Sequence, residues 1–175
     1  TPKWLDVGPT NRWALFDDEV GSLTTAATSM TYVLTPGLIG GISFLEINAE
    51  NVQVILKDAP GGSIIYNKTF SLDGSIIDSF YAWFFEPKSV IPELAITDLP
   101  VGYFNPELTI IISGTGTVSC GVCKFGLVTI IGGTEDGARL GVISYSRKET
   151  NEFGRVEIVP RRFVKTLEAK IHSDS

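Results

Sequence analysis

The feature that most constrains the fold is a series of short apolar runs divided by turn-forming residues. Between residues 29 and 74 the runs are rich in Ile, Val, Thr, Tyr and Phe, and each stops at Gly, Pro, Asp or Asn. Runs of this length and composition are typical of strands, and their close spacing is typical of a sandwich or barrel. Strands are predicted at 29–34, 41–48, 52–57 and 63–70, with the second and third forming a hairpin.

The later part of the chain continues this pattern. Residues 108–113 and 117–131 are its most apolar part, and the Gly114–Gly116 break between them predicts a central hairpin. Further strands are expected at 140–145, 156–159 and 163–171, with charged residues 146–154 as the loop of a long exposed hairpin. Within the last strand the apolar side chains share one face, and Lys165 is the exception on that face.

The segment 76–85 departs from the strand pattern. Its Ile and aromatic side chains recur at helix-like offsets, which predicts one short helix or an irregular cover. Aromatic side chains at such spacing are more often part of a core, and this interpretation is favoured. The alternative is an exposed platform for a ligand.

Length and charge limit the possible classes. A chain of 175 residues fits a single domain, expected over 1–175 and as the N-terminal part of a longer protein. No apolar run reaches the roughly 18 residues that span a bilayer, so no membrane insertion is predicted. A net charge of −6 disfavours binding to nucleic acid, which depends on clustered Lys and Arg.

The residues that carry most metal and nucleophile chemistry are scarce. Cys120 and Cys123 are the only cysteines and His172 is the only histidine, too few for a tetrahedral zinc site or for most His-based nucleophile systems. Two buried free thiols are predicted, and neither a cofactor nor an enzymatic activity is expected. The acidic residues Asp17, Asp18 and Glu19 supply candidates for hydrolysis, and Asp17 and Asp18 are the candidates for Ca²⁺. Without EF-hand spacing a solvated acidic turn is favoured and no metal site is predicted.

The segment 8–18 combines turn formers, aromatic residues and paired carboxylates, and it predicts a structural corner built by Asn11, Arg12, Trp13 and Asp17. Arg12 is expected to brace this corner by pairing with Asp17 or Asp18. The substitution Arg12→Ala should then lower the melting temperature.

Two motifs resemble known proteins. The opening WLDVGPTNRWALFD, residues 4–17, and the later YSRKETNEFG, residues 145–154, are similar to a family of tailed-bacteriophage tail proteins, some of them labelled as carbohydrate-binding domains. The resemblance implies an all-β fold, a jelly-roll-like antiparallel β-sandwich of galactose-binding type. It also implies a location in the virion, in the phage tail, as one copy of a homo-oligomer in contact with other phage tail proteins.

The function expected from this resemblance is a non-enzymatic structural protein of the tail tip or baseplate. Its contact arm would be the charged hairpin, with candidates at Arg147, Lys148, Glu149, Glu152 and Phe153; an ordinary solvated hairpin is the alternative.

A second possible function is a carbohydrate-binding module that contacts host surface glycans. It would stack sugars on exposed rings, for which the candidates are Trp13, Tyr81, Trp83 and Tyr103. Those rings must then face solvent.

Overall fold

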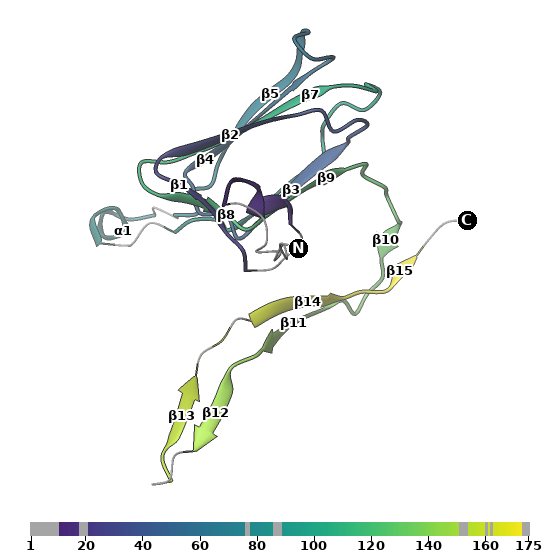
Figure 1. Ribbon diagram of the computed structural model, residues 1–175. Coiled ribbons are helices and arrows are strands. Elements are labelled where there is room, and N and C mark those ends of the chain that lie inside the picture. Colours follow the sequence, from purple (N-terminus) through teal and green to yellow (C-terminus); the bar gives the residue numbers. More distant parts are fainter. Residues whose placement is uncertain are drawn as a thin grey trace, which may run out of the picture. The chain divides into compact units, whose positions relative to one another are not determined.

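The computed structural model describes residues 11–17, 21–75, 78–85, 89–150, 154–159, 161 and 163–172. It is built mostly of antiparallel strands with few helices, which confirms the predicted all-β sandwich class (Figure 1). The contacts within the chain divide it into two compact units, Thr1–Val128 and Thr129–Ser175. The single domain over 1–175 stays a prediction.

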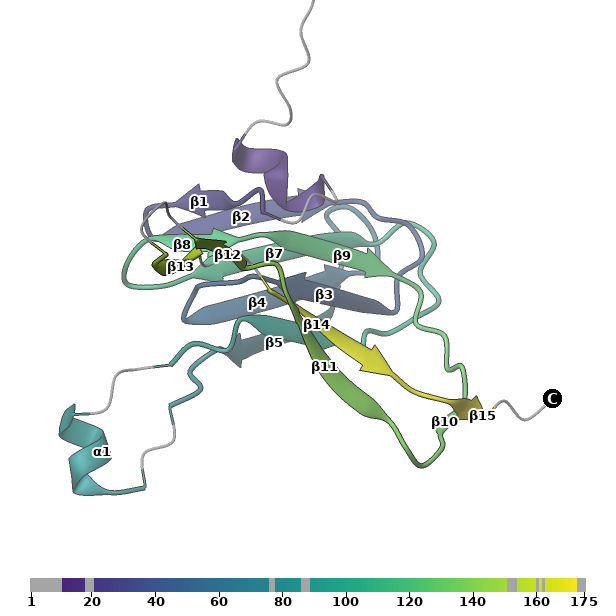
Figure 2. The ribbon, with the colours of Figure 1, turned by 90° about the horizontal axis from the view of Figure 1, so that it is seen from below.

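The first unit contains two main sheets, whose strands overlap in the view of Figure 2. The four-stranded sheet has the order β2 (Ser29–Leu34), β7 (Glu107–Ser113), β4 (Asn51–Lys57) and β5 (Ile64–Ser71). The three-stranded sheet has the order β6 (Glu93–Ile96), β3 (Gly41–Leu45) and β9 (Val122–Gly126). A separate antiparallel pair joins β1 (Thr24–Ala26) to β8 (Val118–Cys120).

The core of this unit follows from the alternation of side chains along its central strands. In β4 and β7 every second residue is buried, because successive side chains of a strand point to opposite faces. Leu108, Ile110 and Ile112 of β7 are fully buried and belong to the same apolar cluster as Ile42 and Phe44 of β3. Both sheets therefore contribute to one core.

Most of the predicted strands exist, but two predicted hairpins are wrong. Residues 41–45 and 51–57 form strands of different sheets, and β4 pairs with β5 and β7. Likewise β7 pairs with β2 and β4, while residues 118–126 supply β8 and β9, which pair with β1 and β3. Each wrong prediction paired two strands that are consecutive in sequence. In the structure the two strands belong to different sheets.

The corner near the N-terminus is a 3₁₀ helix, η1 (Asn11–Phe16). The Asn11 side chain ties it to β1, since its amide donates to the Thr25 carbonyl and its oxygen accepts from the Thr25 amide, both at 3.0 Å. The Tyr32 hydroxyl donates to the carbonyl of Arg12 at 2.7 Å. The Asp17 carboxylate accepts a hydrogen bond from the Ser22 hydroxyl at 2.9 Å, and the Arg12 guanidinium lies 5.8 Å from the centroid of the Trp13 ring.

The second unit is a two-stranded ribbon made of three successive antiparallel pairs. They join β10 (Gly133–Thr134) to β15 (Ile171–His172), β11 (Arg139–Ser144) to β14 (Phe163–Glu168), and β12 (Arg147–Thr150) to β13 (Val156–Val159). A long exposed hairpin exists, but its predicted pairing of 140–145 with 156–159 is wrong, because β11 pairs with β14 and β13 pairs with β12. Residues 147–150 are a strand and not the loop expected from their charge. No described residue of this unit is buried, so the ribbon has no core of its own.

Candidate functional site: two exposed apolar surfaces

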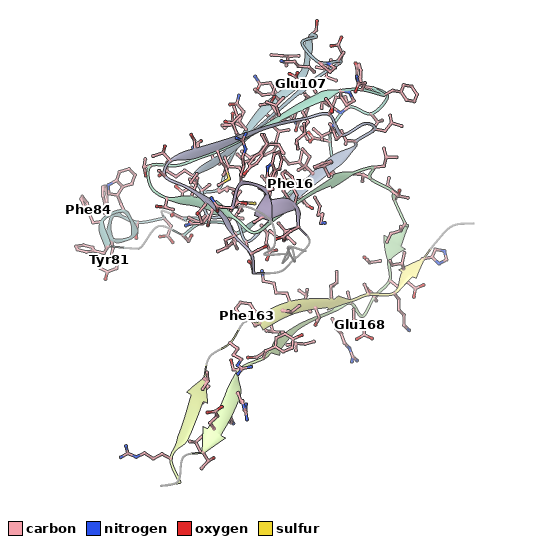
Figure 3. All side chains as sticks on the ribbon, viewed as in Figure 1. Phe16, Tyr81, Phe84, Glu107, Phe163 and Glu168 are labelled. Atoms are coloured by element: carbon pink, nitrogen blue, oxygen red, sulfur yellow. The ribbon has the colours of Figure 1, made fainter. Side chains whose placement is uncertain are left out.

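The first candidate surface is the short helix α1 (Phe80–Phe85), which confirms the helix predicted near this position; residues 76–77 lie outside the described residues. Its five aromatic side chains are between 67% and 88% exposed, and they are Phe80, Tyr81, Trp83, Phe84 and Phe85. Figure 3 shows Tyr81 and Phe84 pointing away from the helix. The Tyr81 and Phe85 rings lie against each other, with centroids 5.0 Å apart.

The favoured interpretation of these aromatic residues as core was therefore wrong. A surface helix buries one apolar stripe and turns a polar stripe to water. In α1 the aromatic side chains follow one another almost without interruption, so they surround the helix and no single side can cover them. An exposed apolar patch of this kind is characteristic of an interaction site.

The four candidate rings for glycan stacking come from three parts of the chain. Tyr81 and Trp83 share α1, where Trp83 borders an open hollow that Asp78 and Ser79 also line. Trp13 is 47% exposed and packs with its ring centroid 5.9 Å from that of Phe16. Tyr103 is 36% exposed and precedes β7. All four rings reach solvent. Tyr81 and Trp83 share α1, but side chains two residues apart on a helix do not face each other.

The second candidate surface lies on the β11–β14 section of the ribbon. Leu140 pairs directly with Leu167, Val142 with Lys165, and Ser144 with Phe163. Side chains of directly paired residues lie on the same face, and alternate pairs share that face. The four apolar side chains of these pairs, here called the apolar ribbon face, are between 61% and 85% exposed; they are Leu140, Val142, Phe163 and Leu167.

The opposite face of the same section is more polar. It carries the pairs Arg139 with Glu168, Gly141 with Thr166, and Ile143 with Val164. Ile143 and Val164 are 49% and 43% exposed, and they are its only large apolar side chains. The ribbon thus has one strongly apolar face and one mixed face.

The charged contact candidates lie in the next section of the ribbon. Arg147, Lys148 and Glu149 belong to β12 and are exposed, and the Arg147 Nε lies 3.4 Å from a carboxylate oxygen of Glu149. Glu152 and Phe153 lie outside the described residues. The sequence analysis named these charged side chains as contact candidates. It placed the residues of the apolar ribbon face in strands and did not identify them as a contact surface.

Two polar clusters lie on the sandwich. Lys57 pairs with Glu107 at 2.5 Å, and the same carboxylate accepts from the Gly61 amide, so these contacts lower the pKa of Glu107. In the second cluster Lys68 and the Tyr66 hydroxyl both donate to Asp98, and Lys68 is the larger cause of the lowered pKa of that carboxyl. Burial, together with the hydrogen bond to Asp98, raises the pKa of Tyr66 to about 12. Both clusters have their donors and acceptors matched, as structural ion pairs do.

Cys120 and Cys123 are free and buried, as predicted, and burial raises the pKa of the Cys120 thiol to about 12. Within the described ranges no group of three or more His, Cys, Asp or Glu side chains could hold a metal ion. Asp18 and Glu19 lie outside those ranges.

No helix in the described part of the chain is long and apolar enough to cross a membrane. Comparisons of the chain with protein-family models, with curated proteins and with solved structures gave no match. The function must therefore be argued from the two apolar surfaces and from the residues around them.

Proposed function

We propose that the chain is a non-enzymatic structural module of a phage tail, at the tail tip or baseplate, that assembles with further copies of itself and with other tail proteins. The observation that carries this proposal is the apolar ribbon face. A two-stranded hairpin alone is marginally stable in water, and one with Leu140, Val142, Phe163 and Leu167 exposed gains stability when a partner covers them.

The neighbouring charges support the same role. Arg147, Lys148 and Glu149 extend the ribbon with side chains of both signs. A polar rim around an apolar centre is the usual anatomy of a protein interface, and the rim contributes mainly to the choice of partner. The placement in a phage tail rests on the resemblance of residues 4–17 and 145–154 to tail proteins.

A second candidate function is the binding of host surface glycans, which the Trp83 ring favours. That ring borders an open hollow that also contains Asp78 and Ser79. Sugar sites combine an exposed ring with polar groups for the hydroxyls, and Asp78 and Ser79 would supply them.

One pair of measurements on the same sample separates these functions. Light scattering over a range of protein concentrations gives the oligomeric state, and a glycan array gives sugar binding. The assembly role predicts an oligomer without sugar binding. A monomer at every concentration, combined with sugar binding that a free sugar competes away, would replace it with the glycan role.

A further inference from the structure

We propose that α1 of one copy packs on the apolar ribbon face of another copy, so that the two surfaces form one head-to-tail contact. This inference rests on the assembly function proposed above and names the two parts that meet. It uses both exposed apolar surfaces in a single interface, which covers the side of α1 that faces the ribbon.

The two surfaces match in size. The six residues of α1 extend about 9 Å, and a helix with its side chains is about 10–12 Å wide. The three cross-strand pairs of the apolar ribbon face cover four residue steps along each strand, about 13 Å. A short helix surrounded by aromatic rings therefore covers this section of the ribbon without reaching far beyond it.

Lys165 distinguishes α1 from a second ribbon as the occupant. It lies on the apolar ribbon face, paired with Val142 and two residues from both Phe163 and Leu167. If two such ribbons packed face to face, this ammonium group would enter an apolar interface close to the Lys165 of the other copy, and taking a charge out of water is costly even when the charge keeps an ion partner. Aromatic rings attract an ammonium group over their faces, so α1 supplies suitable neighbours for Lys165.

The charges of the two units are also complementary. Residues 1–128, which contain α1, hold thirteen Asp and Glu but six Lys and Arg. Residues 129–175, which form the ribbon, hold eight Lys and Arg and seven Asp and Glu. Next to α1, the exposed Asp78 contributes a negative charge. Contact between unlike units of two copies is therefore favoured electrostatically over contact between two acidic units.

A contact between unlike surfaces has a consequence that a symmetric contact lacks. Each copy carries both α1 and a ribbon, so each can bind one neighbour through α1 and another through its ribbon. If one variant has lost α1 as a binding surface and another has lost its ribbon face, the two can still bind each other through the intact surfaces. The resulting heterodimer has no intact surface left and cannot grow further.

The experiment uses two double variants of the chain. The helix variant is Trp83→Ser with Phe84→Ser, and the ribbon variant is Leu140→Ser with Leu167→Ser. All four side chains are exposed, so far-UV circular dichroism should show the fold retained in both. Mass photometry then measures wild type, each variant alone, and an equimolar mixture of the two variants at one concentration.

The expected result is that wild type self-associates and that each variant alone is monomeric. The mixture should form a heterodimer, twice the mass of one chain, and nothing larger. If the helix variant assembles as wild type does, the contact is not made by α1 and this inference fails while the assembly function stands. If the mixture remains monomeric, the inference also fails. A monomeric wild type would overturn both proposals.

A further variant and two controls keep the test independent of the ribbon's stability. Lys165→Glu preserves the apolar side chains and reverses the charge, and it should weaken association at least about tenfold without affecting monomer folding. An unchanged dissociation constant would refute the role given to Lys165. The matched controls are Ile143→Ser with Val164→Ser on the opposite ribbon face, and Phe104→Ser, which removes an exposed ring outside α1; both should associate as wild type does.

Discussion

The clearest quantitative prediction concerns the two leucines that face each other across the ribbon. Changing Leu140 and Leu167 to alanine leaves the backbone pairing in place and removes three carbon atoms from each side chain. Both positions are exposed, so the free energy of unfolding should change by less than about 0.5 kcal/mol each. The dissociation constant for self-association should rise, because the lost apolar area is buried only in the assembly.

The size of this effect follows from the exposed fractions. At about 0.8 kcal/mol for each buried methylene, three carbons contribute about 2.4 kcal/mol when a fully exposed leucine becomes fully covered. Leu140 is 85% exposed and Leu167 is 69% exposed, which scales the two contributions to about 2.0 and 1.7 kcal/mol. Full coverage therefore predicts a rise of about 500-fold in the dissociation constant, and half coverage predicts about 25-fold.

Sedimentation velocity over a concentration series measures this constant for wild type and the double variant. The matched control is Ile143→Ala with Val164→Ala, which truncates a directly paired couple on the other face of the same section. If the apolar ribbon face forms the interface, the dissociation constant rises for the leucine pair and stays unchanged for the control. A rise below about fivefold for the leucines, or an equal rise for both pairs, would refute the assignment of the interface to the apolar ribbon face.

Further predictions concern the sandwich. In β7, Ile110→Ala should reduce the free energy of unfolding by about 3 kcal/mol and Ile111→Ala by about 1 kcal/mol, because Ile110 is fully buried and Ile111 is not. Equal losses in urea denaturation would contradict the alternating burial along β7. Lys57 lowers the pKa of Glu107, so the stability from this carboxylate is present above its unfolded pKa, about 4.3, and is lost as pH falls through the lower folded-state value. Between about pH 6 and about pH 3, the urea midpoint should therefore fall further in wild type than in Glu107→Gln. The Cys120 thiol should react with a colorimetric thiol reagent only after unfolding, since it is fully buried, and rapid labelling of the native protein would contradict that burial.

The sequence predicted strand positions better than strand partners, for a physical reason. Alternation along β4 and β7 reports which side chains share a face, and the structure confirms those faces. The alternation does not indicate which neighbouring strand forms the hydrogen bonds. Glu46, at a φ of 53°, follows β3 directly, and Asn48 forms a bridge with Ser119 before β4 begins. The short connection between the two strands therefore passes from one sheet to the other, although its length suited a hairpin.

The exposure of the two apolar surfaces could not be predicted from the sequence either. An apolar pattern reports that a side chain gains free energy by leaving water, and it does not report which molecule covers it. The aromatic run of α1 and the alternation at Leu140 and Val142 have the composition of core segments, yet in the structure of one chain both are exposed. Sequences that fold well are locally consistent with their structures, and the exceptions concentrate at functional sites. The disagreement between a core-like pattern and an exposed position is therefore itself the reason to look for the missing cover in another copy.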